Sequence, residues 1–123
     1  MQAFDLSNHV HPTDAVRLIN RLRKYYEPQY VESVAPISDV KGMAEARTKL
    51  DLPVSEHVGN ARHALALWEA RAVDIINIAN SAHGGMRESL KVVALARISQ
   101  CAVKRRWSTV GESPARELVR STR

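Results

Sequence analysis

One local group of side chains has the composition of a ligand site: three adjacent cations followed by an aromatic residue, Lys104-Arg105-Arg106-Trp107. Cations contact phosphates, and an indole ring stacks on a base or a sugar. Arg17 and Arg21 are four residues apart, which places both on one face of a helix. We expect these six residues to hold the phosphate backbone of DNA or RNA. The alternative is that the cations only complement a helix dipole and that Trp107 caps the core.

The distribution of charge supports this expectation. Residues 1–85 hold nine Lys/Arg against ten Asp/Glu, whereas residues 86–123 hold nine against three, so the excess behind the net charge of +5 lies in the last third of the chain. A basic region attracts polyanions. We therefore expect the C-terminal third to form the electrostatic face.

The sequence offers little support for catalysis or metal binding. It has no glycine-rich phosphate loop, no Gly-x-Ser-x-Gly and no His-Glu-x-x-His. His57 and His63 are six residues apart on an expected helix, so they cannot chelate one metal from the same face. Cys101 is the only cysteine and is expected to pack in mid-helix. We expect no enzyme, no cofactor and no metal.

The strongest structural pattern is a heptad spacing that begins at Val54 and ends at Ala82. Alternating steps of four and three join nine apolar residues: Val54, Val58, Ala61, Leu65, Trp68, Ala72, Ile75, Ala79 and Ala82. Such a seam is typical of a long helix that packs against another helix. His83-Gly84-Gly85 supplies a break. The pattern predicts an antiparallel helical hairpin with arms at about 55–82 and 86–106.

The hairpin is apolar on more than one side, which favours a homo-oligomer, most simply a dimer. The expected interface, with the hairpin as dimer or partner surface, consists of Leu65, Trp68, Ala72, Ile75, Val92, Ala96 and Val103. Arg97 falls among apolar residues of the second arm, and a buried arginine needs a partner. We expect a structural ion pair between Arg97 and Glu69 or Asp74.

Shorter helices are expected at about 12–27 and 39–50, so the predicted fold is all-α, a small bundle of four to five helices around the hairpin. Residues 43–64 loosely resemble a helix-turn-helix, although helix packing without DNA explains them as well. We expect one helical domain over residues 1–123, with flexible ends at 1–10 and 108–123. No stretch is apolar enough for a membrane, and we expect a cytoplasmic protein.

Two hypotheses of function follow. The first is a small, basic, nucleic-acid-associated regulatory protein that binds DNA as a homodimer. The alternative is a non-enzymatic inhibitor or adaptor that binds another protein through the hairpin.

Overall fold

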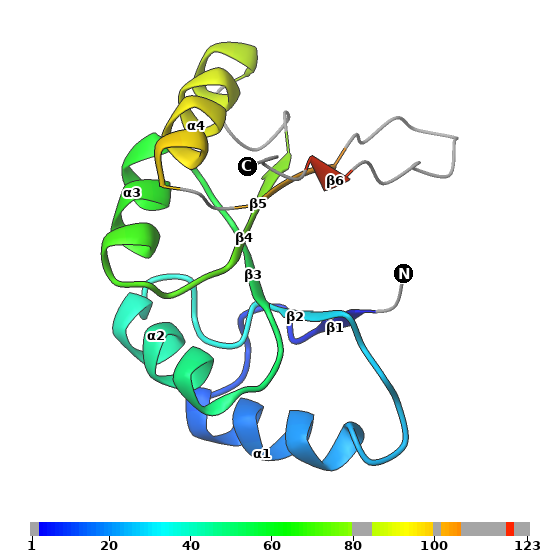
Figure 1. Ribbon diagram of the computed structural model, residues 1–123. Helices are drawn as coiled ribbons and strands as arrows, with labels where there is room; N and C mark the ends of the chain where they lie inside the picture. Colours follow the sequence, from blue (N-terminus) through cyan, green and yellow to red (C-terminus); the bar gives the residue numbers. More distant parts are fainter. Residues whose placement is uncertain (1–2, 80–84, 100–101, 107–117, 120–123) are drawn as a thin grey trace.

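The computed structural model describes residues 3–79, 85–99, 102–106 and 118–119. Strands and helices alternate along the chain (Figure 1). In order they are β1 (Ala3–Asp5), α1 (Pro12–Leu22), β2 (Tyr30–Glu32), α2 (Val40–Lys49), β3 (Val54–His57), α3 (Ala61–Glu69), β4 (Ile75–Ala79), α4 (Met86–Ile98), β5 (Ala102–Arg106) and β6 (Leu118–Val119).

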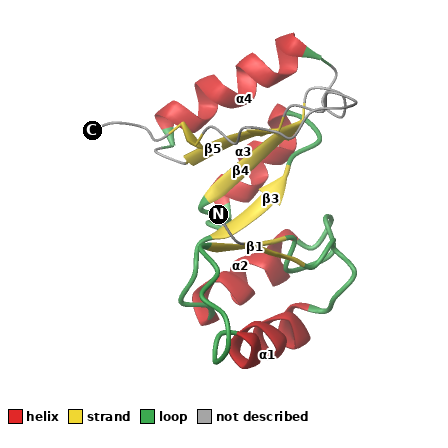
Figure 2. Ribbon diagram, turned by 90° about the vertical axis from the view of Figure 1, so that its right-hand side faces the viewer, coloured by secondary structure: helices red, strands yellow, loops and turns green. Residues whose placement is uncertain are grey.

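The strands form one sheet in the order β1-β2-β3-β4-β5-β6, with five parallel strands and β6 antiparallel to β5. Each parallel strand is the spatial neighbour of the one before it. Because crossovers between parallel strands are right-handed, an order that never reverses places every connecting helix on the same face. Helices α1 to α4 accordingly lie on one side of the sheet, and Figure 2 looks onto the strands from the other side, with α2 and α3 behind them.

The helices begin where capping groups satisfy their free N–H groups. Pro12 stands in the first turn of α1, and the side chains of Asp39 and Asn60 accept hydrogen bonds at the starts of α2 and α3, from Gly42 N and His63 N. Helices α1 and α2 lie within the ranges of 12–27 and 39–50 that the sequence predicts.

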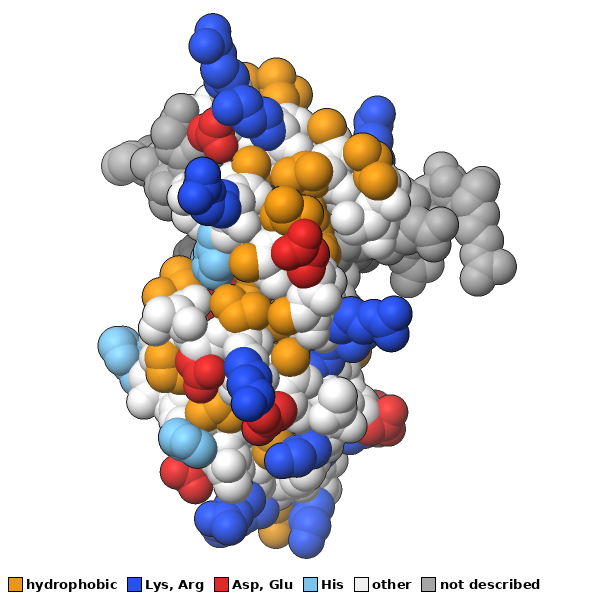
Figure 3. All heavy atoms as spheres, turned by 90° about the vertical axis from the view of Figure 1, so that its left-hand side faces the viewer, with side chains coloured by type: hydrophobic (Ala, Val, Ile, Leu, Met, Phe, Trp, Pro, Cys, Tyr) orange, Lys and Arg blue, Asp and Glu red, His pale blue; other side chains and the backbone are white. Residues whose placement is uncertain are grey.

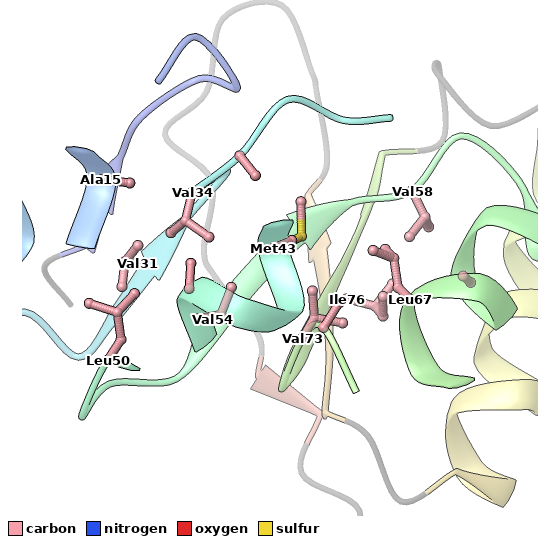
Figure 4. Close-up of a cluster of buried hydrophobic side chains, with 14 of the residues drawn as sticks. Ala15, Val31, Val34, Met43, Leu50, Val54, Val58, Leu67, Val73 and Ile76 are labelled. Atoms are coloured by element: carbon pink, nitrogen blue, oxygen red, sulfur yellow. The ribbon is translucent and has the colours of Figure 1, made fainter. Parts of the chain in front are cut away.

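The hydrophobic core lies between the sheet and the helices (Figure 4). Val31, Val54 and Ile76 project from the strands towards Met43 of α2 and Leu67 of α3, and all five are fully buried. Strands β2 and β3 are buried almost throughout, as is typical of parallel sheets.

The all-α prediction is wrong. Among the described residues, the expected arm at 55–82 is instead strand β3, helix α3 and strand β4, and the second arm consists of helix α4 at 86–98 and strand β5 at 102–106. The heptad spacing failed because three of its hits, Val54, Ile75 and Ala79, belong to strands. Its last hit, Ala82, lies outside the described residues. Val54 and Ile75 start β3 and β4, and their spacing to the next hits coincides with a helical step. Three isoleucines at 75, 76 and 78 are the signal of a buried strand that the heptad obscured.

The possible helix-turn-helix at 43–64 is also replaced, since β3 separates α2 from α3. Helices of 9 and 13 residues replace the long two-sided arms from which a homo-oligomer was inferred. None of the helices in the described ranges combines the length and apolar character that a membrane crossing needs. The extent of the domain, 1–123, and the flexible ends at 1–10 and 108–123 stay predictions.

Candidate active site at the carboxyl ends of the strands

Polar side chains gather where the parallel strands end. The register places Asp5 beside Glu32, Glu32 beside Ser55, and His57 beside Asn77. Register partners share a face of the sheet, and so do residues two apart on a strand. Because the intervening Val31, Val54 and Ile76 face the helices, these five residues project from the helix-free face. We call Asp5, Glu32, Ser55, His57 and Asn77 the edge cluster.

Glu32 is the centre of the edge cluster. Only 6% of the residue is exposed. Its Oε1 accepts a hydrogen bond from Asn77 Nδ2 at 2.5 Å, and His57 Nε2 lies 2.7 Å from the same oxygen. A carboxylate removed from water needs such donors. Side chains from β3 and β4 therefore hold Glu32 in a fixed orientation.

Asn77 holds Glu32 with an amide that is itself oriented. Its Nδ2 also lies 3.2 Å from Ser55 Oγ, and the residue is 1% exposed. Because the NH₂ group of the amide is directed at Glu32 and Ser55, the amide oxygen must point elsewhere. Within the described ranges, this buried Oδ1 has no hydrogen-bond partner. The amide thus serves Glu32 and leaves one acceptor unused.

Asp5 lies on β1, the strand that pairs with β2, and is exposed. Its Oδ1 accepts hydrogen bonds from the backbone N of Ser7 at 2.8 Å and from Ser7 Oγ at 3.4 Å. Asp5 and Glu32 are register partners, so two carboxylates of different exposure stand side by side at the sheet edge.

A second polar group lies beneath this edge, on the helix side of the sheet. Glu56 lies two residues from both Val54 and Val58, which belong to the core, so it shares their face of the sheet, and it is 0% exposed. Its Oε2 accepts from Asn8 Nδ2 at 2.8 Å, and its Oε1 from His57 N at 2.7 Å and Ser33 Oγ at 3.2 Å. Burial raises the pKa of Glu56, and these three hydrogen bonds oppose the rise. We call Glu56, Asn8 and Ser33 the Glu56 cluster.

The edge cluster has ligands suited to a hard divalent cation. Mg²⁺ prefers oxygen donors and is commonly bound through one or two carboxylates, with water and substrate completing its shell. Asp5 and Glu32 fit that arrangement as neighbouring carboxylates. Across the part of the chain that the structure describes, no three His, Cys, Asp or Glu side chains converge into a ready-made metal cage. The donor set therefore fits a cation that relies on water and substrate for its remaining ligands.

The family model described as "Enolase C-terminal domain-like" matches residues 2–109. The chain belongs to this family.

A curated relative, the L-Ala-D/L-Glu epimerase of Clostridium acetobutylicum, is 29% identical over 90 residues, which cover 71% of this chain and 25% of the relative. Among solved structures, the dipeptide epimerase of Enterococcus faecalis matches with a TM-score of 0.80 and 24% identity, covering 86% of this chain and 31% of that one. The L-Ala-D/L-Glu epimerase of Bacillus subtilis matches with a TM-score of 0.78 and 23% identity, covering 90% and 31%. The chain thus spans about a quarter to a third of the length of these relatives.

These findings overturn the predicted function. The chain is a member of an enzyme family, and its named relatives are epimerases, so the predictions of a DNA-binding regulator, of a non-enzymatic inhibitor or adaptor, and of no enzyme are wrong. The predicted DNA, RNA or protein partner is withdrawn with them, because the names of these relatives identify small-molecule substrates. The predicted homodimer loses its basis, since it was inferred from long two-sided helical arms that the structure replaces with shorter helices. The charge asymmetry that motivated them is a property of the sequence alone, and it does not identify a polyanion site.

The structure separates the residues predicted to bind nucleic acid. Lys104, Arg105 and Arg106 lie in β5, and Trp107 lies outside the described residues. Arg17 and Arg21 are exposed on α1, which connects β1 and β2. These two strands stand at the opposite end of the strand order from β5. On the helix-covered face, basic side chains are dispersed among acidic ones (Figure 3).

The predicted interface residues are similarly divided. Ala72, Val92 and Ala96 are buried in the core of this chain, and Ile75 is 8% exposed. Leu65 is exposed, Trp68 is partly buried, and Val103 lies in β5. Ala72, Val92 and Ala96 therefore pack inside the chain, between the sheet and the helices.

The predicted ion pair takes a different form. Asp74 pairs with Arg47 of α2, whose Nε donates to Asp74 Oδ2 at 3.0 Å and whose Nη2 donates to Oδ1. Arg97 and Glu69 are both exposed. The premise of a buried Arg97 fails because the helix that carries it is covered on one side only.

Sequence reasoning missed the whole edge cluster. A signal was present: the apolar residues Ala3, Tyr30, Val54, Ile75 and Ala102, which begin the five parallel strands, follow one another at intervals of 21 to 27 residues. A repeat of that length is typical of strand-helix units. The polar residues that come two or three positions after the first four of these, Asp5, Glu32, His57 and Asn77, are the ones that the parallel register brings together.

Proposed function

We propose that this chain supplies the strand-end site of an enzyme that moves a proton at the carbon next to a carboxylate of a small substrate, with the help of a divalent cation. The observation that carries the proposal is the register pairing of Asp5 and Glu32 at the carboxyl edge of a one-sided parallel sheet. In barrels built from such units, active sites lie at this edge.

The chemistry of the family supports the same assignment. Enolase-superfamily sites use a lysine or histidine base and one or two Mg²⁺ ions, which stabilise the ene-diolate formed when the proton leaves. A solved dipeptide epimerase that resembles this chain contains Mg and the dipeptide L-Leu-L-Tyr. We assign the cation to Asp5 and Glu32, and a dipeptide or similar small carboxylate as the substrate.

We assign to His57 the transfer of the substrate's proton. It stands on β3 in the same edge cluster, and its side chain is 31% exposed, so a substrate can reach it. Imidazole gains and loses a proton near neutral pH. Glu32 Oε1, 2.7 Å from Nε2, orients the ring.

The first test is binding of Mn²⁺, used as a paramagnetic substitute for Mg²⁺ and followed by electron paramagnetic resonance. The wild type should bind one ion, and Asp5→Asn and Glu32→Gln should each weaken binding at least tenfold. Glu45→Gln removes the same charge from the exposed face of α2 and serves as the matched control. If Glu45→Gln lowers the affinity as much as Glu32→Gln does, the ion is bound by general charge and the assignment is wrong.

The second test follows the reaction. In deuterated water with Mg²⁺, exchange of the Glu α-proton of L-Ala-L-Glu is monitored by proton NMR. Exchange should require both carboxylates and should be lost in His57→Gln. Exchange that persists in His57→Gln would remove the histidine from its proposed role.

The cytoplasmic location stays a prediction, which fractionation of the producing cells would check.

A further inference from the structure

The Glu56 cluster lies outside the edge cluster, yet it touches the backbone on which the edge cluster stands. Glu56 is fully buried on the helix side of β3. Its partners come from elsewhere: Asn8 follows β1, and Ser33 follows β2. One side chain on the third strand is therefore bound to the segments that leave the first two.

Additional hydrogen bonds join the same segments. Asn8 Nδ2 donates to Ala35 O at 2.7 Å as well as to Glu56, and Asn8 N donates to Ser33 O at 3.3 Å. Ser33 N in turn donates to Ser55 O at 3.0 Å. The exits of β1, β2 and β3 are thus joined across the sheet, with the Glu56 carboxylate at the centre.

The backbone at these exits adopts a conformation that must be held. Ser7, Asn8 and Ser33 have φ angles of 53°, 59° and 60°, in the left-handed region that non-glycine residues seldom occupy. Asparagine tolerates this region better than serine. Residues in such conformations persist only where their surroundings constrain them, and they concentrate at functional sites.

The acceptor at the centre must be a carboxylate. Asn8 Nδ2, Ser33 Oγ and His57 N all direct a hydrogen towards Glu56. An ionised carboxylate only accepts, so it satisfies all three, whereas an amide of the same shape brings an NH₂ group against one of them. Glutamine at position 56 therefore fills the space without completing the network.

We propose that Glu56 is a positioning residue, which fixes the backbone exits of β1 and β2 and thereby the separation of the Asp5 and Glu32 carboxylates. Asp5 stands two residues before the first of the left-handed pair at Ser7 and Asn8, and Glu32 stands directly before Ser33. A change in either exit moves a carboxylate at the helix-free face. The effect on the cation rests on the proposed function, whereas the effect on the backbone does not.

The experiment compares Glu56→Gln with Ile19→Val, which removes a methyl group from the fully buried core on α1 and lowers stability without touching either cluster. Amide hydrogen exchange at Asn8 and Ser33 is measured by NMR well below the melting temperatures of both variants. Mn²⁺ affinity is measured on the same samples. Glu56→Gln should accelerate exchange at these two amides and weaken Mn²⁺ binding about tenfold, as supporting residues around metal ligands do. Ile19→Val should do neither.

Three outcomes separate the two claims. If Glu56→Gln leaves exchange at Asn8 and Ser33 as in Ile19→Val, the positioning role is refuted. If exchange accelerates and Mn²⁺ affinity falls, the whole proposal is supported. If the wild type binds no Mn²⁺, the proposed function fails, while the exchange data still decide the backbone role of Glu56. If Glu56→Gln does not fold, Ser33→Ala takes its place in the same measurements, because it removes one of the three hydrogen bonds that the Glu56 carboxylate accepts.

Discussion

The Arg47–Asp74 pair gives a sharp prediction because it competes with the pair that the sequence suggested. Asp74 lies just before β4, and its Oδ2 accepts from the backbone N of Val54 at 2.9 Å as well as from Arg47. It therefore fastens α2 to the start of two adjacent strands. Asp74→Ala removes all of these contacts at once.

The cost is estimated contact by contact. A hydrogen bond from a backbone N–H to a charged oxygen contributes about 1.5–3 kcal/mol. The ion pair is bidentate, but about a third of each side chain is exposed, so we assign it about 1 kcal/mol. Asp74→Ala should then lower the free energy of unfolding by about 3 kcal/mol, which is about 10 °C in melting temperature for a chain of this size.

Urea unfolding followed by circular dichroism measures this cost. Asp74→Ala and Arg47→Ala should be coupled by about 1 kcal/mol in a double-mutant cycle. Arg97→Ala, at an exposed position, should change stability by less than about 0.5 kcal/mol. A cycle without coupling, or a loss at Arg97 equal to that at Asp74, would refute the reasoning.

Three further predictions concern the site and the core. Because burial raises the pKa of Glu56 above its ordinary 4.5, the folded state binds more protons than the unfolded state between those two pKa values. Stability should therefore fall as pH rises through that window, and urea unfolding across pH should show a smaller fall in Glu56→Gln. Asn77→Ala removes a donor from Glu32 and should weaken Mn²⁺ binding about tenfold, measured by titration against wild type. Leu67→Ala empties a fully buried position and should cost about 3 kcal/mol, whereas Leu90→Ala, 61% exposed, should cost less than about 0.5 kcal/mol, both by urea unfolding.

The helices could be predicted where local signals determine them. Pro12 marks the start of α1, and the polar residues before Val40 mark that of α2. The strands could not be predicted in the same way, since β1 to β4 have only three to five residues each and derive their stability from neighbours distant in sequence. A spacing of four or three between apolar residues carries no information about such pairing.

The site was harder to predict for a related reason. Asp5, Glu32, His57 and Asn77 are 20 to 27 residues apart, so no local motif contains two of them. Only the parallel register makes them neighbours. The basic run at 104–106, by contrast, is conspicuous because it is contiguous, and contiguity is not what a sheet edge requires.

Alternation along the strands has an evolutionary consequence. On β2, Val31 faces the helices, whereas Glu32 faces the opposite side, so one residue maintains packing and the next supplies a polar group to the edge cluster. Each strand contributes its polar residue independently of the others. A lineage can therefore exchange one polar residue of the edge cluster at a time, while the buried half of every strand stays as it was.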